Sequence, residues 1–241
     1  MKSKSLNLAA LTFAVISAIG IGIAFNALLK NSNLNNSKVI STNNKTETSS
    51  YKKKEIKRQK VTDTQSKNQQ LTKNKQEELE KMWKTGYDQF FKQEYKQAIA
   101  TERQVIKEDP NFYKAYTVEG IALAYSGNFN KGMEQINHAL KLKPNYGYGM
   151  FNKALANELF GNYDEAIKWY KKDLEVEKFV WSYYGIASIY GRKGDINNAI
   201  KYLKLAIDIN PNIKNVAKTE DDFNNVHKYT EFKKLIFNAD N

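Results

Sequence analysis

The sequence repeats itself at a nearly constant interval, and this period constrains the fold more than any other feature. Small residues mark the period, because Ala98, Gly132, Ala166 and Ala199 follow one another at almost equal spacing. Each of the three prolines of the chain lies twelve residues after a small residue of this series. A period of about 34 residues is typical of proteins built from one repeated supersecondary unit. The sequence therefore predicts a stacked array of units.

Residues inside each period predict two helices joined by a turn. Gly127 and Gly161 each begin a Gly-Asn-aromatic segment, and glycine tolerates the left-handed conformation that ends a helix. The prolines end each second helix, because their ring disfavours helix in the preceding residue. A single unit cannot cover its own apolar face, so at least three must stack. The sequence provides four, at residues 79–112, 113–146, 147–179 and 180–213.

These positions together resemble the tetratricopeptide repeat family, whose unit of about 34 residues has small residues, an aromatic residue and a closing proline at fixed places. The matching residues, unit by unit, are Gly86, Tyr95, Ala98, Val105 and Pro110; Gly120, Gly127, Phe129, Gly132, Ala139 and Pro144; Ala154, Gly161, Tyr163 and Ala166; and Ala187, Gly194, Ile196, Ala199, Ala206 and Pro211. The resemblance implies an all-α, right-handed superhelical solenoid over residues 76–213.

The sequence departs from the family pattern in two units. The first unit has Gln93 where glycine is usual. The third unit has Asp173 where alanine is usual, lacks the closing proline and is one residue shorter than the others. The junction between the third and fourth units is therefore the least certain packing contact of the predicted solenoid.

Residues 214–241 are expected to form a helical cap on the last open face of the solenoid. Apolar residues recur there at helical spacing. They are Phe223, Val226, Phe232, Leu235, Ile236 and Phe237. The acidic run from Glu220 to Asp222 suits a helix N-terminus, where negative charge is favoured. The segment also resembles tails that close bacterial arrays of this family.

Residues 1–30 are predicted to be a membrane anchor. Residues 6–29 carry no charge, and as a helix they would be about 36 Å long, enough to cross a bilayer. A cleaved signal peptide is the alternative, with small residues at Ala18 and Gly20. The short basic N-terminus with Lys2 and Lys4 favours a single-pass protein of the cell membrane whose folded part lies outside the cytoplasm.

Residues 31–75 are rich in Asn, Ser, Thr, Lys and Gln, and we expect them to form a disordered basic linker. The net charge of residues 1–78 is +9, whereas residues 79–241 carry only +3 of the total +12. A nucleic-acid-binding domain is basic on its folded surface, so no nucleic acid is expected. The basic cluster from Tyr51 to Lys60 could contact an anionic surface, or serve only as a solvated spacer.

The sequence shows no pattern that indicates catalysis, a cofactor or a metal. The chain has no cysteine and only two histidines, His138 and His227, which lie far apart in the sequence. Common phosphate-binding, dinucleotide-binding, zinc-protease and serine-hydrolase motifs are absent. The sequence therefore predicts that the protein is not an enzyme. The composition, rich in Lys, Asn and Ile, is typical of an AT-rich bacterium.

The resemblance implies that the first helix of each unit lines a concave groove. The groove residues carried over from the family are Trp83, Tyr87, Phe90, Phe91, Lys114, Ile121, Tyr125, Tyr148, Phe151, Glu158, Trp181, Tyr184 and Arg192. Aromatic side chains are good interface anchors, although any one of them could instead belong to the core. The Lys and Asn residues that hold acidic C-terminal peptides in chaperone-binding members are absent.

Three hypotheses follow for the function of the chain. The first is a membrane-tethered module that binds an apolar or amphipathic peptide or a partner protein in this groove. The second is a scaffold built by self-association of solenoids. The third is a secreted protein with a cleaved signal that contacts anionic wall polymer through its basic linker. The sequence identifies neither the partner nor the cellular process.

Overall fold

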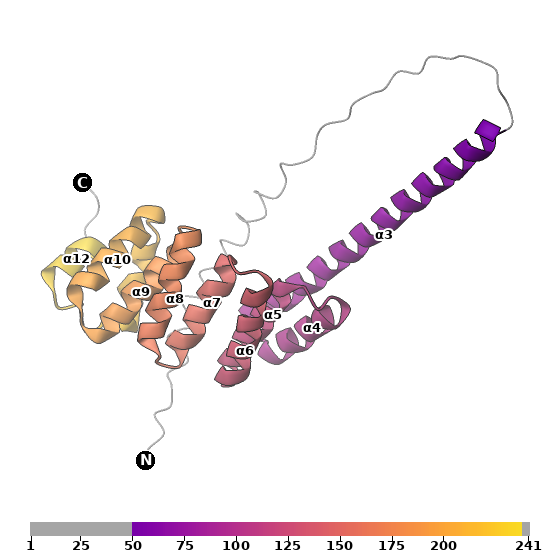
Figure 1. Ribbon diagram of the computed structural model, residues 1–241. Coiled ribbons are helices and arrows are strands. Elements are labelled where there is room, and N and C mark those ends of the chain that lie inside the picture. Colours follow the sequence, from indigo (N-terminus) through magenta and orange to yellow (C-terminus); the bar gives the residue numbers. More distant parts are fainter. Residues whose placement is uncertain (1–49, 238–241) are drawn as a thin grey trace, which may run out of the picture. The chain divides into compact units, whose positions relative to one another are not determined.

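The computed structural model describes residues 50–237, and their side chains from residue 70 onward. Over residues 50–237 the chain is entirely helical, with ten α-helices, one short 3₁₀ helix and no strand (Figure 1). The helices are α3 (Ser50–Phe91), α4 (Tyr95–Glu108), α5 (Tyr113–Tyr125), α6 (Phe129–Leu142), α7 (Gly147–Leu159), α8 (Tyr163–Val176), α9 (Val180–Lys193), α10 (Ile196–Ile209), α11 (Ile213–Thr219), η2 (Asp221–Phe223) and α12 (Thr230–Phe237).

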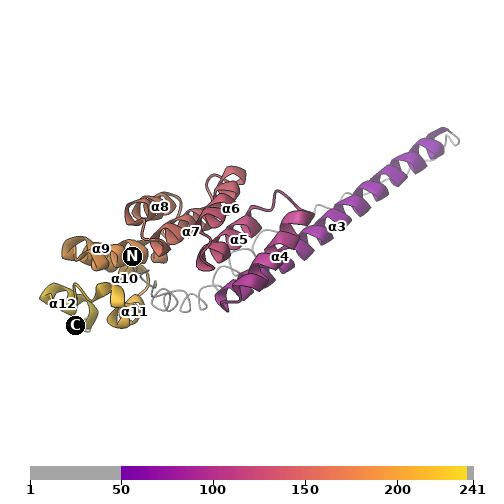
Figure 2. The same cartoon turned by 90° about the horizontal axis from the view of Figure 1, so that it is seen from below.

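The described residues fall into two units, residues 50–81 and residues 82–237. Within residues 82–237, the helices pack as successive antiparallel pairs, α5 with α6, α7 with α8 and α9 with α10 (Figures 1 and 2). The first helices of these pairs begin at Tyr113, Gly147 and Val180, the three residues that begin the second, third and fourth predicted repeats. The prediction of an all-helical repeat solenoid is therefore confirmed for residues 82–237.

The α-helical pairs are closed by turns that require a left-handed residue. Gly127, Gly161 and Gly194 have φ values of 85°, 77° and 73°. Gln93 occupies the equivalent place in the first unit with a φ of 63°. Its turn is closed by the same pair of backbone hydrogen bonds, from Gln93 N to Phe90 O and from Glu94 N to Gln89 O, both 2.9 Å. Gln93 thus adopts a conformation that costs free energy for a residue with a Cβ atom, whereas the same conformation costs glycine none.

We expect Gln93→Gly to raise the free energy of unfolding by about 1 kcal/mol, because the left-handed strain is removed. The matched control is Gly127→Gln, which places the same residue in the same kind of turn and should lower stability by about the same amount. Urea unfolding followed by circular dichroism measures both. A Gln93→Gly variant that is less stable than the parent chain would show that the Gln93 side chain contributes more than its strain costs.

The two helices of the second repeat, α5 and α6, approach each other closely where each of them has a glycine. A Cβ atom added to Gly132 on α6 would lie 2.6 Å from the carbonyl oxygen of Gly120 on α5. The core beside this crossing includes Ala98, Ile121 and Ile136, all with no exposed surface. A second apolar cluster, which includes Tyr170 and Ile186, lies between the third and fourth units. The predicted role of the small residues is thereby explained by direct backbone contact.

Residues 50–75 correct the prediction of a disordered linker, because they form part of the long helix α3. The segment from Ser50 to Phe91 contains only one glycine, Gly86, and no proline, and Lys, Gln and Glu are good helix formers. Pairs four residues apart support the exposed part of α3, with Gln70 donating to Asn74 at 2.8 Å and Lys73 lying 4.0 Å from Glu77. Low apolar content, which predicted disorder, is equally compatible with a solvated helix of this kind.

The junction between the third and fourth units is polar where the family pattern has alanine. Asp173 on α8 is fully buried, and its Oδ2 accepts a hydrogen bond of 2.5 Å from the Ser182 hydroxyl on α9. The pKa of Asp173 is raised to about 7, chiefly by burial; the Ser182 hydrogen bond opposes the rise and the nearby Glu177 adds to it. The helices remain packed through Ala166, Ile186 and Ile189. The shortened third unit therefore keeps its junction.

The C-terminal segment packs on α9 and α10, where a cap is needed. Phe223, Val226, Phe232 and Ile236 are buried, whereas Phe237 is 57% exposed. The segment consists of α11, the 3₁₀ turn η2 and α12. The predicted anchor at residues 6–29 lies outside the described residues. Within residues 50–237, no helix is both long enough and apolar enough to span a membrane.

Candidate functional site

The first helices form the inner layer of the solenoid. Helix α5 packs against α7, and α7 packs against α9, whereas successive second helices approach each other less closely. Closer spacing of one layer places that layer on the inside of the curve. We call the predicted groove residues on α3, α5, α7 and α9, together with Ser188, the first-helix face.

Partly buried aromatic residues cluster at the N-terminal end of the first-helix face. The ring of Tyr87 lies 5.6 Å from Trp83, 4.6 Å from Phe91 and 6.0 Å from Tyr148 between centroids. The ammonium group of Lys114 lies 4.8 Å from the centroid of the Trp83 ring. The structure thus brings together five predicted residues that come from three helices and from three different repeats.

Other predicted groove residues belong mainly to the core. Ile121 has no exposed surface, and Phe90 packs edge-on against Tyr125 with centroids 5.4 Å apart. Phe151 contacts the rings of Tyr170 and Phe179, which belong to the α8 side of its unit. The family positions alone could not distinguish these buried residues from exposed ones. The reason is that the same position of the repeat can lie at the edge of a helix interface in one repeat and face solvent in another.

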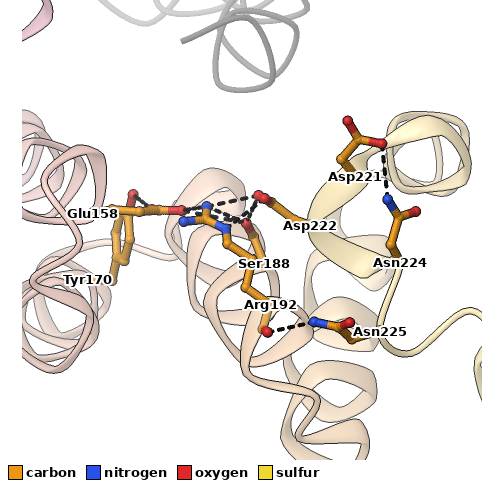
Figure 3. A network of polar contacts seen from close by, with 8 residues as sticks. All are labelled: Glu158, Tyr170, Ser188, Arg192, Asp221, Asp222, Asn224 and Asn225. Atoms are coloured by element: carbon orange, nitrogen blue, oxygen red, sulfur yellow. Dashed lines mark hydrogen bonds and ion pairs between the residues drawn. The ribbon is translucent and has the colours of Figure 1, made fainter. Parts of the chain in front are cut away.

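A buried polar network occupies the C-terminal end of the first-helix face (Figure 3). Arg192 on α9 donates to Glu158 on α7 and to Asp222 in η2. Its Nη2 atom lies 2.8 Å from Asp222 Oδ2, and its Nε atom lies 2.6 Å from Asp222 Oδ1. Ser188 also donates to Asp222, and Tyr170 on α8 donates a 2.6 Å hydrogen bond to Glu158. One guanidinium therefore joins two repeats to the cap.

Acidic groups outnumber the guanidinium at this end of the face. Glu158, Asp222 and the buried Glu220 all act on the Tyr184 hydroxyl, and together with burial they raise its pKa. The pKa of Glu220 is raised to about 7, chiefly by burial and then by Asp222, while Arg192 opposes the rise. Two carboxyl groups, those of Glu158 and Asp222, thus contact the Arg192 guanidinium, and Glu220 interacts with it electrostatically.

Several polar atoms of the first-helix face are buried without a hydrogen-bond partner among the described residues. They are Trp83 Nε1, Tyr125 Oη, Trp181 Nε1 and Tyr184 Oη. Burial raises the pKa of Tyr125 and Tyr184, so both hydroxyls stay protonated and can donate. A buried donor without a partner costs about 1–3 kcal/mol, and the native structures of proteins satisfy nearly all such groups. These four atoms are themselves buried, so they belong to the packed interior of the first-helix face and not to its accessible surface.

Sequence reasoning missed the connection between Asp222 and Arg192. It assigned the acidic run to a helix N-terminus, and Asp221 and Asp222 do lie in the first turn of η2. It did not foresee that Asp222 also forms an ion pair with Arg192, while Asp221 accepts a hydrogen bond from Asn224 at 3.1 Å. A signal for the network was present. Glu158 and Arg192 lie 34 residues apart, as do Ser188 and Asp222. One repeat period places two residues at equivalent places on adjacent units, so opposite charges at that spacing indicate a contact.

The arrangement of helices indicates what kind of protein this is. No group of three or more potential metal ligands occurs in the part of the chain that the structure describes. The Arg192 guanidinium is engaged with the carboxyl groups of Glu158 and Asp222. Paired helices stacked in a row, with an aromatic inner face, define a helical repeat protein, and such a fold indicates a protein–protein interaction module.

The sequence model described as Tetratricopeptide repeat matches residues 149–178 and 182–213. The chain belongs to the tetratricopeptide repeat family, whose members are generally scaffolds without enzymatic activity. Among curated proteins, an uncharacterised protein of Methanocaldococcus jannaschii is 39% identical over 72 residues, which are 29% of this chain and 84% of that protein.

Two solved structures are similar to the chain. A thermophilic tetratricopeptide repeat protein of Thermus thermophilus aligns with a TM-score of 0.53 at 17% identity, over 58% of this chain and 78% of that one. The tetratricopeptide repeat domain of Sgt2 from Aspergillus fumigatus is 25% identical, with a TM-score of 0.39, over 42% of this chain and 66% of that one. The Thermus structure shows that the fold is shared.

Proposed function

We propose that the chain is a membrane-tethered protein–protein interaction module that binds an apolar segment of a partner on its first-helix face. The observation that carries the proposal is the cluster of partly buried aromatic rings on the first-helix face, Trp83, Tyr87, Phe91 and Tyr148. Aromatic rings supply large contact area with few rotatable bonds.

The charges of the face support an internal segment over a free C-terminus as ligand. Arg192 is already paired with Glu158 and Asp222, so its charge is not available to hold a terminal carboxylate. Lys114 lies over the Trp83 ring, where the ring face attracts it. A ligand with uncharged, apolar side chains loses little solvation on this surface and gains its aromatic contacts.

Membrane attachment through residues 6–29 is part of the proposal. A single tethered span would confine the solenoid near the bilayer and raise the local concentration of membrane partners. The supporting observation is the uncharged run from Leu6 to Leu29, long enough for the hydrocarbon core. We propose that the solenoid lies on the extracytoplasmic side.

The test is partner capture by the full chain in lipid nanodiscs, with and without changes on the first-helix face. Replacing Trp83, Tyr87 and Tyr184 with alanine should lower capture at least about tenfold, since interface aromatics are typical binding hot spots. The matched control replaces Tyr116, Trp169 and Tyr202, aromatic residues outside this face, and should leave capture unchanged. Equal capture by the two triple variants, at equal helical content, would refute the proposed face.

A further inference from the structure

The third repeat has an open hollow on the side of α7 that faces away from the first-helix face. The hollow has a volume of about 480 Å³ and is lined by Asn145 before α7, Met150 on α7, and Lys172, Glu175 and Val176 on α8. Met150 and Tyr148 are two residues apart on α7, so their side chains point in directions about 160° apart around the helix. The hollow is therefore separate from the face to which Tyr148 belongs.

Two lysine side chains lie over the ring of Trp169, about one helical turn from the hollow. The ammonium nitrogen of Lys153 on α7 lies 3.7 Å from the centroid of that ring, and the ammonium nitrogen of Lys172 on α8 lies 4.1 Å from it. Lys172 also lines the hollow, and Val176, which lines it too, is 44% exposed. Basic, aromatic and apolar side chains thus meet on one surface, which we call the outer site: Met150, Lys153, Trp169, Lys172 and Val176.

The two lysines of the outer site are accessible and have no partner for an ion pair. Lys153 and Lys172 form no hydrogen bond or ion pair with any residue whose side chain the structure describes. Glu165, on the same side of α8, lies 3.2 Å from Lys168 and accepts a 2.9 Å hydrogen bond from Trp169. Neither ammonium nitrogen of the outer site is a buried atom, so both can receive a ligand.

Positive charge accumulates at the outer site. Burial lowers the pKa of Lys153, Glu165 opposes that effect, and Lys172 and Lys168 lower the pKa further. An anion beside these lysines would relieve their repulsion. Because both ammonium groups lie over one ring, their nitrogens are no farther apart than the sum of their distances to its centroid. A carboxylate that accepts hydrogen bonds of about 2.8 Å at both oxygens can bridge two ammonium groups at that separation.

The charges around the outer site favour one carboxylate over a polyanion. Lys153, Lys168 and Lys172 act together there, but Glu165 also acts on Lys153 and Glu175 lines the hollow. Three positive and two negative groups leave a net charge of only +1. A nucleic acid or an acidic polymer would bring a row of negative charges against both glutamates, which would repel it.

Apolar surface next to the lysines adds a second requirement for the ligand. Met150 is 9% exposed within the hollow, and Val176 is more exposed on α8. Covering such surface with an apolar side chain is favourable. The outer site therefore fits a segment that presents one carboxylate and one large apolar side chain close together.

We propose that the third repeat has a second docking site, the outer site, for a segment of a partner protein in which an Asp or Glu stands next to a large apolar side chain. The carboxylate lies between the ammonium groups of Lys153 and Lys172, and the apolar side chain enters the hollow against Met150 and Val176. The inference goes beyond the proposed function, because the outer site lies on the other side of α7 and takes a charged segment.

Fluorine NMR of the full chain in phosphatidylcholine nanodiscs tests the outer site, because the chain has only three tryptophans. Fluorotryptophan labels all three, and Trp83→Phe, Trp169→Phe and Trp181→Phe, made one at a time, assign the signals. The probe is the capped peptide acetyl-Gly-Leu-Glu-Leu-Gly-amide, which should shift the Trp169 signal until it saturates. The analogue with Gln in place of Glu should need at least about fivefold more peptide for half-saturation, since the charge-assisted hydrogen bonds are lost.

Lysine variants supply the second arm of the experiment. Lys153→Gln with Lys172→Gln should raise the half-saturating concentration of the Glu peptide at least about fivefold, because the carboxylate loses both partners. Lys171→Gln with Lys204→Gln removes the same charge at exposed positions outside the outer site and should leave that concentration unchanged. A Trp169 signal that does not respond to the peptide, equal binding of the Glu and Gln peptides, or equal weakening by the two pairs of substitutions would overturn the proposal.

Two further measurements identify a different occupant. Heparin serves as a soluble polyanion, and a Trp169 shift at a lower heparin concentration than peptide concentration would reject the peptide ligand in favour of a polyanion. A Trp169 signal that changes on dilution without any peptide would overturn the proposal as well, because it would indicate a second copy of the chain on the site. A Trp169 signal independent of protein concentration and insensitive to heparin supports the proposal.

The outcomes separate this inference from the proposed function. Trp83 belongs to the first-helix face, so a response of its signal alone would reject the outer site, whereas a response of Trp169 alone supports it. The control variant of the capture experiment also changes Trp169, but an apolar ligand on the first-helix face does not use that ring. If the Trp169 signal ignores the peptide while the capture experiment succeeds, only the outer site is rejected. If capture does not depend on the first-helix face while Trp169 responds, only that face is rejected.

Discussion

Arg192→Met is expected to lower the free energy of unfolding by about 3 kcal/mol at pH 7, because breaking a buried ion pair strands its partners. Arg192 is 20% exposed at its side chain, and its partners Glu158 and Asp222 are 4% and 14% exposed. Methionine retains much of the volume of arginine but supplies no charge. The two carboxyl groups would then lie in the protein without a cation.

The pH dependence of this effect has a definite sign. In the parent chain, burial raises the pKa of Glu158, while Arg192 and the Tyr170 hydrogen bond oppose that effect. Without Arg192 the folded-state pKa rises further. A raised carboxyl pKa leaves stability intact below the unfolded value near 4.5 and removes it as pH rises. The loss caused by Arg192→Met should therefore be small at pH 4 and reach its full size near pH 7.

Lys193→Met is the matched control, since it removes the neighbouring positive charge. Lys193 lies 2.7 Å from Asp164, whose side chain is 95% exposed, and exposed ion pairs contribute about 0–1 kcal/mol. Urea unfolding from pH 4 to pH 8 compares the two variants. Adding Glu158→Gln and Asp222→Asn to Arg192→Met should recover most of the lost stability. A loss at pH 4 equal to that at pH 7 would contradict the role assigned to the charge.

The repeat boundaries were predictable because they follow from local chemistry and spacing. Glycine at the turns and proline after the second helices place Tyr113 and Gly147 at helix starts, and the repeat period places Val180. The period also predicts which helices are neighbours. Each repeat carries these signals in its own sequence. The repeat boundaries therefore remain predictable although Gln93 and Asp173 depart from the family pattern.

The linker and the detailed site were not predictable in the same way. A polar segment such as residues 50–75 satisfies the criteria for both disorder and a solvated helix, and low hydrophobicity alone does not separate them. Side-chain burial on the first-helix face depends on neighbouring units. Ile121 and Tyr148 both occupy positions that face the groove in the family, yet only Ile121 is fully buried. Asp222 and Arg192 lie 30 residues apart, which is not one repeat period, so the repeat spacing does not indicate their contact.

Glu102→Gln is expected to stabilise the protein at pH 7, an unusual result for a change at a fully buried residue. Glu102 on α4 has no exposed surface, and neither carboxyl oxygen has a hydrogen-bond partner among the described residues. The carboxyl group packs against Gly86 of α3, where an added Cβ would lie 2.2 Å from its Oε1. The nearby Glu119 pairs with Arg103 at 2.7 Å, so that guanidinium is engaged elsewhere.

Burial, with a further contribution from Glu119, raises the pKa of Glu102 from 4.5 to about 9. The folded state therefore holds a proton that the unfolded chain releases above pH 4.5. Stability from this group is fully present below pH 4.5 and is lost as pH rises toward 9. At pH 7 the difference of about 2.5 pH units from 4.5 corresponds to a loss of about 3 kcal/mol.

Glutamine resembles the protonated carboxyl group in size and does not titrate, so Glu102→Gln should abolish this part of the pH dependence. The variant should match the parent chain near pH 4 and exceed its stability by about 3 kcal/mol at pH 7. Glu94→Gln, at an exposed position that makes no capping hydrogen bond, changes the same charge in the same unit and should have little effect. Unfolding curves of the three chains at pH 4, 5.5 and 7 measure this effect. If the free energy of unfolding changed with pH in the same way for Glu102→Gln and for the parent, Glu102 would be ionised in the folded state and would have a partner there.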